Sequence, residues 1–157
     1  MPLKPQDQAP DFKLLSDKNQ EVALSDFAGK NLVIYFYPKD STPGCTIESK
    51  DFTALSPEFT KLNTVILGVS KDSIASHQKF KAKHDFPFLL LSDPEGKMCE
   101  AYDAWGEKSM FGKKYMGIIR STFLINSQGK IHQAWYKVKV KNHAKQVLET
   151  AQSMLET

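Results

Sequence analysis

Two uninterrupted apolar runs constrain the fold of this chain more than any other feature. Residues 32–37 and 65–70 are apolar on both faces, which is typical of central strands in a sheet that is covered on each side. A helical pattern at residues 46–55 lies between them, and an amphipathic segment at 72–84 follows the second run. This alternation predicts an α/β fold built around parallel strands.

Flanking segments are expected to extend this sheet and to cover it. The further expected strands are residues 11–15 and 21–24 as an N-terminal hairpin, 86–91, and 121–125 and 131–138 as a C-terminal hairpin. The further expected helices are residues 97–102 and 142–155, the second capped by Asn142. Residues 103–117 are interpreted as a long loop. The sequence therefore predicts one α/β domain over residues 1–157 with a mixed central sheet.

Local patterns add detail to these elements. In the first predicted helix, Ile47, Phe52 and Leu55 are expected to face the core. Pro57 follows a serine that suits an N-cap, so the helix is expected to kink or restart there. The alternating lysines of residues 137–141 are interpreted as the solvent face of a half-buried strand.

Charge and cysteine content exclude several classes of function. A net charge of +3 with scattered lysines does not indicate a nucleic-acid partner. No apolar segment has the length of a signal peptide or a membrane span, so we expect a cytoplasmic protein with no membrane partner. Cys45 and Cys99 are too few for a disulfide framework, and neither has His or Cys at metal-ligand spacing. We therefore expect no metal and no cofactor, and we expect the four dispersed histidines to lie at the surface.

The only arginine of the chain is a candidate functional residue. Of 21 basic residues, 20 are lysine, so the preference for lysine fails at Arg120 alone. A planar guanidinium is needed where a fixed set of donors must meet an anion or a polar ligand. A structural salt bridge is the alternative explanation.

Cys45 lies where the first apolar strand passes into the first helix. A free thiol has a pKa of about 8.5, but the start of a helix stabilises the thiolate through its dipole and its unpaired N–H groups. The Thr42 hydroxyl can donate to that thiolate, and Arg120 can add a fixed positive charge. Pro38 would shield the sulfur, and Gly44 with its preceding proline would turn backbone N–H groups inward. These residues predict a reactive cysteine.

The spacing of these residues resembles the active-site signature of the peroxiredoxins. The pattern Pro38-x-x-x-Thr42-x-x-Cys45 matches that signature, and the longer stretch YFYPKDSTPGCTIE is similar to the bacterioferritin comigratory protein, or Q-type, subgroup. The similarity extends over nearly the whole chain, including LSDPEG and AWGEKSMFGKKYMGIIRSTFLI. It implies a thioredoxin-like fold and reduction of hydrogen peroxide or organic hydroperoxides without metal or haem.

This resemblance also implies a role for each matching residue. Cys45 corresponds to the peroxidatic nucleophile, which becomes a sulfenic acid, and Thr42 to the hydroxyl that contacts thiolate and peroxide. Pro38 corresponds to the shielding proline and Arg120 to the arginine of the peroxide pocket. Glu48 matches the acidic residue that orients this arginine. The subgroup further suggests a monomer.

The sequence departs from its subgroup in the resolving cysteine. Many members carry that cysteine five residues after the first, where this chain has Lys50, and others carry it in the next helix, which has none here. Two routes then remain open: resolution by an external thiol such as glutathione, thioredoxin or glutaredoxin, or a partnership with Cys99. The alternative for Cys99 is a buried structural role.

Two other classes of function share parts of this pattern. A thiol-disulfide oxidoreductase needs a Cys-x-x-Cys motif, but the residue three after Cys45 is Glu48. A peroxide sensor or holdase would use the same cysteine without efficient turnover. Turnover with a recycling thiol separates the peroxidase from this second class.

Overall fold

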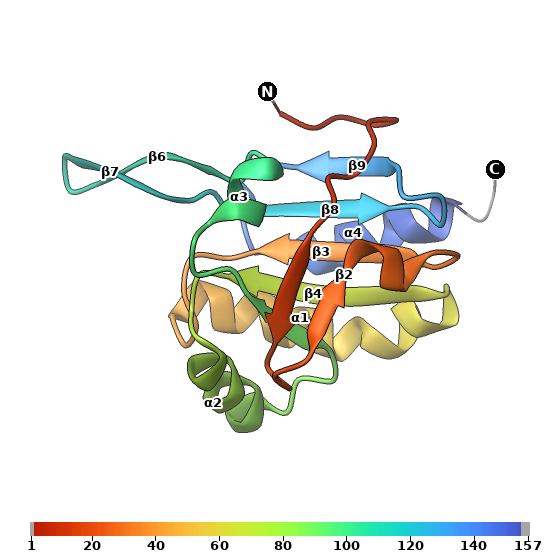
Figure 1. Ribbon diagram of the computed structural model, residues 1–157, viewed down its shortest axis with the longest axis horizontal. Coiled ribbons are helices and arrows are strands. Elements are labelled where there is room, and N and C mark those ends of the chain that lie inside the picture. The colour runs from red at the N-terminus through yellow and green to blue at the C-terminus, as the bar shows by residue number, and fades with distance from the viewer. Residues whose placement is uncertain (1, 155–157) are drawn as a thin grey trace.

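A seven-stranded mixed sheet forms the centre of the computed structural model, which describes residues 2–154 (Figure 1). The strand order is β2-β1-β5-β4-β3-β8-β9. The strands are β1 (Lys13–Ser16), β2 (Glu21–Ala23), β3 (Asn31–Phe36), β4 (Thr64–Ser70), β5 (Leu89–Ser92), β8 (Ser121–Ile125) and β9 (Ile131–Trp135). β3, β4 and β5 run parallel to one another. β8 pairs antiparallel with β3, and β9 pairs antiparallel with β8. The predicted mixed sheet and both predicted hairpins are confirmed.

Alternate side chains of β3 enter two separate apolar layers. Leu32, Ile34 and Phe36 pack into one cluster, and Val33 and Tyr35 pack into the other. This division explains why the strand is apolar at every position, because each face is covered. The two apolar runs of the sequence therefore form the buried centre of the fold.

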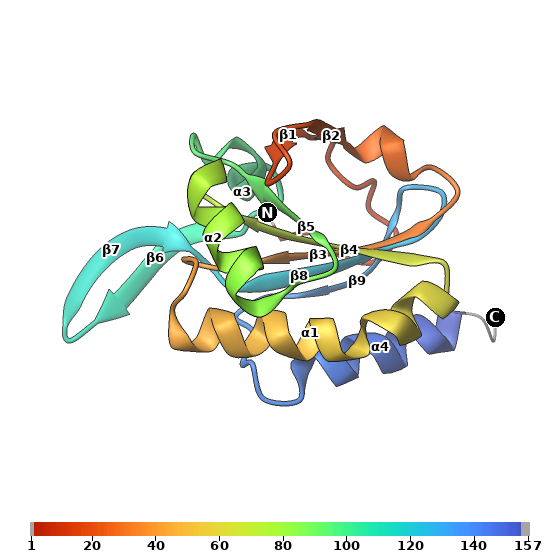
Figure 2. The same ribbon diagram turned by 90° about the horizontal axis from the view of Figure 1, so that it is seen from below.

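Helices and the N-terminal segments cover the two faces of the sheet. α1 (Pro43–Lys61) and α4 (His143–Ser153) lie side by side on one face, as Figure 2 shows. The N-terminal hairpin, the 3₁₀ helix η1 (Leu24–Phe27) and α3 (Lys97–Ala101) lie on the opposite side. α2 (Ile74–His84) connects β4 to β5 and buries Phe80 in the same layer as α1 and α4.

The expected restart of the first helix at Pro57 is wrong, because α1 continues through this residue. Pro57 is exposed, so the hydrogen bond that it cannot donate is lost on the solvent side, where water can bind the free carbonyl. Phe52 and Phe59 flank the proline on the buried side and hold both halves of the helix against one core. The helix begins with Pro43 at its first turn, so Cys45 belongs to that turn.

One expected core contact of α1 is also wrong. Ile47 is 54% exposed, whereas Glu48 and Ser49 are buried. Cys45, Glu48, Ser49 and Phe52 follow the i, i+3, i+4, i+7 spacing of a single helix face, and Ile47 lies outside it. The buried face of α1 thus begins with polar residues, a pattern typical of a functional site.

The interpretation of residues 103–117 as a long loop is wrong, because residues 105–118 form a hairpin. β6 (Trp105–Met110) pairs antiparallel with β7 (Lys113–Ile118), and the hairpin projects from the body of the protein (Figures 1 and 2). Phe111 and Gly112 form the turn with positive φ angles of 52° and 79°. This conformation suits a two-residue hairpin turn but is uncommon for phenylalanine, so the turn is not evident from the sequence.

The C-terminal segment differs from expectation at two further places. β9 ends at Trp135, and Lys137 has a φ of +52°, so the alternating lysines do not form a strand. Val138 instead donates its N–H to the carbonyl oxygen of Arg120. Asn142 occupies the N-cap position of α4, but its side chain makes no capping bond. The last predicted helical residue, Leu155, lies outside the described residues.

No helix within residues 2–154 combines the length and the apolar character needed to cross a membrane.

Candidate active site

The strand-to-helix junction places Cys45 in the first turn of α1, directly after β3 and a short polar segment. Thr42 is the N-cap residue and Pro43 has the fixed φ that suits a first helical position. The Cys45 side chain is 0% exposed and packs in the layer that contains Tyr35 and Phe52. Its thiol therefore lies at the positive end of a 19-residue helix, shielded from bulk water.

A single guanidinium joins the two buried acidic groups of this turn. Nη2 of Arg120 lies 3.4 Å from Cys45 Sγ, and Nη1 donates to Glu48 Oε1 at 2.6 Å. Arg120 comes from the segment between β7 and β8, so residues 75 positions apart in sequence meet here. This geometry brings together Cys45, Glu48 and Arg120 among the predicted site residues.

Gly44 allows this approach because it has no side chain. A Cβ atom at position 44 would lie 3.2 Å from Nη2 of Arg120, which is tighter than nearly all real contacts of that kind. A side chain at position 44 would require the guanidinium to shift by a few tenths of an ångström. The glycine of the motif thus leaves room for the close approach of Arg120.

The Thr42 hydroxyl has a different partner from the one expected. It donates to the carbonyl oxygen of Lys39 at 2.8 Å and not to the cysteine sulfur. This bond closes the polar segment on itself and leaves the lone pairs of the hydroxyl available as acceptors. Pro38 is half-buried at the start of the same segment.

Burial and charge shift the pKa values of the site in different directions. Burial raises the pKa of Glu48 from 4.5 to about 7, although the adjacent Arg120 opposes this. Burial disfavours the charge on Arg120, but Glu48 and Cys45 outweigh it and raise the pKa of the guanidinium. Lys108 of β6 is a further cation that interacts with Arg120 and Cys45. Burial together with Arg120 lowers the pKa of Lys108, whereas Cys45 opposes that change. Lys108 was not recognisable as a site neighbour from sequence, because it lies in the segment interpreted as a loop.

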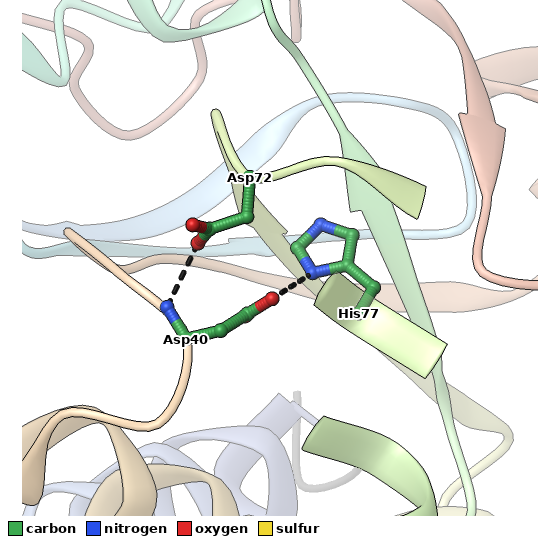
Figure 3. Close-up of side chains that lie close together, drawn as sticks. All are labelled: Asp40, Asp72 and His77. Atoms are coloured by element: carbon green, nitrogen blue, oxygen red, sulfur yellow. Dashed lines mark hydrogen bonds and ion pairs between the residues drawn. The ribbon is translucent and has the colours of Figure 1, made fainter. Parts of the chain in front are cut away.

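A buried polar cluster anchors the segment that leads into the site. Figure 3 shows Asp40, Asp72 and His77 pointing toward one another. Asp40 Oδ2 lies 2.7 Å from His77 Nδ1, and the Asp40 N–H donates to Asp72 Oδ2 at 2.8 Å. The Tyr37 hydroxyl donates to Oδ1 of Asp40, and the Ser76 hydroxyl donates to Oδ2. These bonds tie the residues just before Thr42 to α2 and to the end of β4.

Hydrogen bonds within the protein engage both oxygens of Asp40, Oδ2 of Asp72 and both ring nitrogens of His77. Asp72 Oδ2 accepts from Ser70 as well as from Asp40, and His77 Nε2 faces the carbonyl oxygen of Leu91 at 2.9 Å.

The expectation that all four histidines lie at the surface is wrong, since His77 is 0% and His143 is 4% exposed. Helical spacing places His77 beside Phe80 on the buried face of α2, which was the available sequence signal.

Comparisons with known proteins agree with this geometry. A sequence profile of the AhpC/TSA family matches residues 5–134. Peroxiredoxin Bcp of Bacillus subtilis is 53% identical over 149 residues, with 95% of each chain covered. The chain belongs to the peroxiredoxin family. It is therefore a thiol-dependent peroxidase.

Solved peroxiredoxin structures show the same thioredoxin-like fold. A structure of peroxiredoxin Q from Xanthomonas campestris has a TM-score of 0.87 and 51% identity, with 90% of each chain covered. A cysteine-to-serine mutant of PrxQ from Xylella fastidiosa has a TM-score of 0.93 and 39% identity over 99% of each chain. The predicted family and fold are confirmed.

The second cysteine of this peroxiredoxin lies in the other apolar layer. Cys99 is 0% exposed and packs with Met98 and Tyr102, on the side of the sheet opposite Cys45. Its N–H donates to Asp93 Oδ2 at 2.9 Å. Burial and the Asp93 carboxylate raise the pKa of the Cys99 thiol far above its ordinary value. Both cysteines are free thiols, and the sheet separates them.

His143 links the site to the start of α4. Its Nε2 lies 2.8 Å from Thr122 Oγ1, and its ring packs edge-on against Phe52. Burial, with a smaller contribution from Arg120, lowers the pKa of His143 from 6.5 to about 4. The imidazole is thus buried in its neutral form.

This buried histidine predicts a loss of stability in acid. Between pH 6.5 and about 4 the unfolded chain binds a proton at His143 that the folded chain does not, so stability falls as pH falls, by about 3 kcal/mol in total. Chemical denaturation of the wild type and of His143→Gln across this range should show that difference. Glu48 contributes with the opposite sign in both proteins, so it cancels from the comparison. If the free energy of unfolding depended on pH in the same way in both proteins, His143 would not be buried in its neutral form.

Proposed function

We propose that Cys45 is the peroxidatic thiol of this peroxidase and that it reduces hydrogen peroxide and alkyl hydroperoxides. The observation that carries the proposal is the shared guanidinium, since Arg120 contacts both the Cys45 sulfur and Glu48. The structure of a Xanthomonas campestris relative is described in connection with its alkyl peroxide reduction activity, which supports the same substrate class here.

In this proposal the Cys45 thiolate attacks one peroxide oxygen. An S–O bond forms, the O–O bond breaks, and negative charge develops on the departing oxygen. Arg120 and the N–H groups of the first turn of α1 stabilise that charge more than they stabilise the ground state. Thr42 accepts a hydrogen bond from the peroxide, because its own hydrogen is donated to Lys39. Pro38 and Gly44 shape the site around these groups.

We assign the resolving step to an external thiol. Lys50 is exposed on α1, where many members of the subgroup carry a cysteine, and Cys99 faces the opposite layer of the sheet. A Cys45–Cys99 disulfide would require the sheet to open, because bonded cysteines need their Cα atoms within about 7 Å. Thioredoxin, glutaredoxin or glutathione in the cytoplasm would return the sulfenic acid to a thiol, with the peroxiredoxin acting as a monomer.

One equivalent of peroxide should identify the product directly. We expect intact mass spectrometry and peptide mapping to show a sulfenic acid at Cys45, trapped by dimedone, with Cys99 remaining a thiol. Addition of thioredoxin, glutaredoxin or glutathione to the oxidised protein then identifies the reductant. A Cys45–Cys99 disulfide or a cross-linked dimer as the main product would contradict the one-cysteine scheme. Family membership does not favour the sensor or holdase alternative, and continuous turnover with a reductant tests it.

A further inference from the structure

One peptide group in the segment before α1 is hydrogen-bonded on both of its sides. The N–H of Asp40 donates to Oδ2 of Asp72 at 2.8 Å, and the carbonyl oxygen of Lys39, in the same peptide group, accepts from the Thr42 hydroxyl at 2.8 Å. A trans peptide group is planar, so its N–H and C=O point in opposite directions and an anchor on the N–H sets the direction of the C=O. Asp72 therefore determines where the acceptor for the Thr42 hydroxyl lies.

The direction of the Thr42 bond is fixed by the chemistry of its partner. A carbonyl oxygen only accepts, so the hydroxyl hydrogen of Thr42 occupies the bond to Lys39. The Thr42 oxygen is left with lone pairs, which accept a hydrogen bond but do not provide one. A hydroperoxide brings its own hydrogen, so an oxygen that is held as an acceptor suits this substrate.

Asp72 is held in place from β4 and is not the cap of α2. Ser70 at the end of β4 donates to the same Oδ2 of Asp72 at 2.6 Å and accepts from the Asp72 N–H at 3.1 Å. The N-cap of α2 is Ser73, whose hydroxyl accepts from the N–H of Ser76. The Asp72 carboxylate thus joins the end of β4 to the segment before the site, and its charge strengthens both bonds that it accepts.

The segment before α1 needs an anchor because part of its backbone is unfavourable. Ser41 has a φ of +64°, in the left-handed region that is uncommon for a residue with a side chain. The Asp40 side chain supplies a second anchor, since its Oδ2 lies 2.7 Å from Nδ1 of His77. Figure 3 shows both bonds meeting at Asp40, one through its N–H and one through its carboxylate.

We propose that Asp72 is a positioning residue of the peroxidase, which acts through the peptide group of Lys39 and Asp40 to keep the Thr42 hydroxyl an acceptor for the peroxide hydrogen. This inference rests on the proposed reaction at Cys45, with Thr42 as the acceptor in it. A carboxylate on the N–H side also polarises the peptide group and makes its carbonyl oxygen a stronger acceptor, so the Thr42 hydrogen is held more firmly. Without Asp72, the hydroxyl is free to rotate and to turn its hydrogen away from Lys39.

Asp72→Ala tests this role with two reactions of the same thiol. Oxidation by an alkyl hydroperoxide uses the acceptor, whereas alkylation by iodoacetamide needs the thiolate but no acceptor for a peroxide hydrogen. Stopped-flow measurements should show oxidation of Cys45 slowed by about 10-fold, the effect of one lost hydrogen bond, with alkylation changed by less than about twofold. Asp72→Asn keeps an acceptor oxygen and should recover most of the rate. Asp26→Ala is the matched control, because it removes a carboxylate that accepts from a backbone N–H at 2.9 Å in η1, and it should behave as the wild type.

A second comparison tests whether Asp72 acts through Thr42. Thr42→Val keeps the shape of the side chain but removes the hydroxyl, and it should itself slow the oxidation of Cys45 by peroxide. In this background Asp72→Ala should cause no further loss, because no hydroxyl hydrogen remains to be directed. If the two losses multiply instead, Asp72 acts by another route and the inference is overturned.

Two results with Asp72→Ala alone would also overturn the inference. One is an unchanged rate with peroxide, and the other is an equal slowing of oxidation and alkylation, which would reduce Asp72 to a general support for the start of α1. If Asp72→Ala does not fold, Ser70→Ala removes a bond that orients the carboxylate and should slow oxidation more than alkylation; equal effects there would overturn the inference in the same way. Failure of the wild type to consume peroxide would refute the proposed function of Cys45, which is a distinct result.

Discussion

Replacement of Cys45 by serine is expected to abolish peroxide reduction, with kcat/KM falling by about four orders of magnitude or more. A serine hydroxyl is almost never ionised at neutral pH and is a poor nucleophile toward peroxide oxygen. The contact with Arg120 would remain, so the loss would come from the chemistry of sulfur. Peroxide consumption with a thiol reductant in excess measures this effect.

The matched variant Cys99→Ser should retain most of the activity per folded molecule. Cys99 lies across the sheet from the site, so its side chain does not reach the reacting atoms. Serine adds a polar group to an apolar layer, and Cys99→Ala serves as a second variant if the serine protein is unstable. Comparable loss of activity in both Cys99 variants, with the fold intact, would contradict a one-cysteine cycle.

Replacement of Arg120 by lysine is expected to slow the reaction with peroxide by about 100-fold, although the positive charge is kept. The guanidinium reaches Cys45 with one nitrogen and Glu48 with the other, and an ammonium group cannot hold both positions. Stopped-flow oxidation of Cys45 measures the loss.

Alkylation of the thiol separates the two contributions of Arg120. If the arginine stabilises the resting thiolate, iodoacetamide should react more slowly with Arg120→Lys at neutral pH. If its main role is in the transition state, alkylation should change less than peroxide reduction does. An unchanged rate with peroxide would remove Arg120 from the reaction.

The central strands and the reactive turn could be predicted from the sequence, because each is determined locally. An apolar run without polar interruption has no favourable place except a covered sheet, and residues 31–36 and 64–70 form β3 and β4 accordingly. The spacing from Pro38 to Cys45 fixes the junction in the same way. The unusual arginine was identified by composition alone, and its partners confirm the unusual environment.

The errors occur where tertiary contacts override a local rule. Pro57 normally ends a helix, but Phe52 and Phe59 hold α1 together from its buried side. Phe111 is an unfavourable residue for a positive φ, so the β6–β7 turn gives no signal in the sequence. The alternating lysines indicate a strand, but Lys137, with a φ of +52°, interrupts the extended backbone soon after β9 ends at Trp135.

Two buried features around Cys45, the Asp40–His77 pair and the unpaired oxygen of Glu48, cannot be predicted from local sequence patterns. Asp40 precedes the motif and His77 lies in α2, and only the folded chain shows that they form a buried pair. Glu48 follows from the motif as a partner of Arg120, but its bare oxygen is visible only in the structure. Sequence therefore predicts the reacting groups, and the structure shows which contacts hold them in place.

The separation of the two thiols by the sheet gives the protein an internal reporter of its own packing. A thiol-reactive probe reaches Cys45 when the first turn of α1 opens, but it reaches Cys99 only when the opposite layer loses its packing. Labelling at Cys99 therefore reports the unfolding of the molecule, independently of opening at the first turn of α1. The same sulfur is a natural attachment point for following unfolding without introducing a new cysteine.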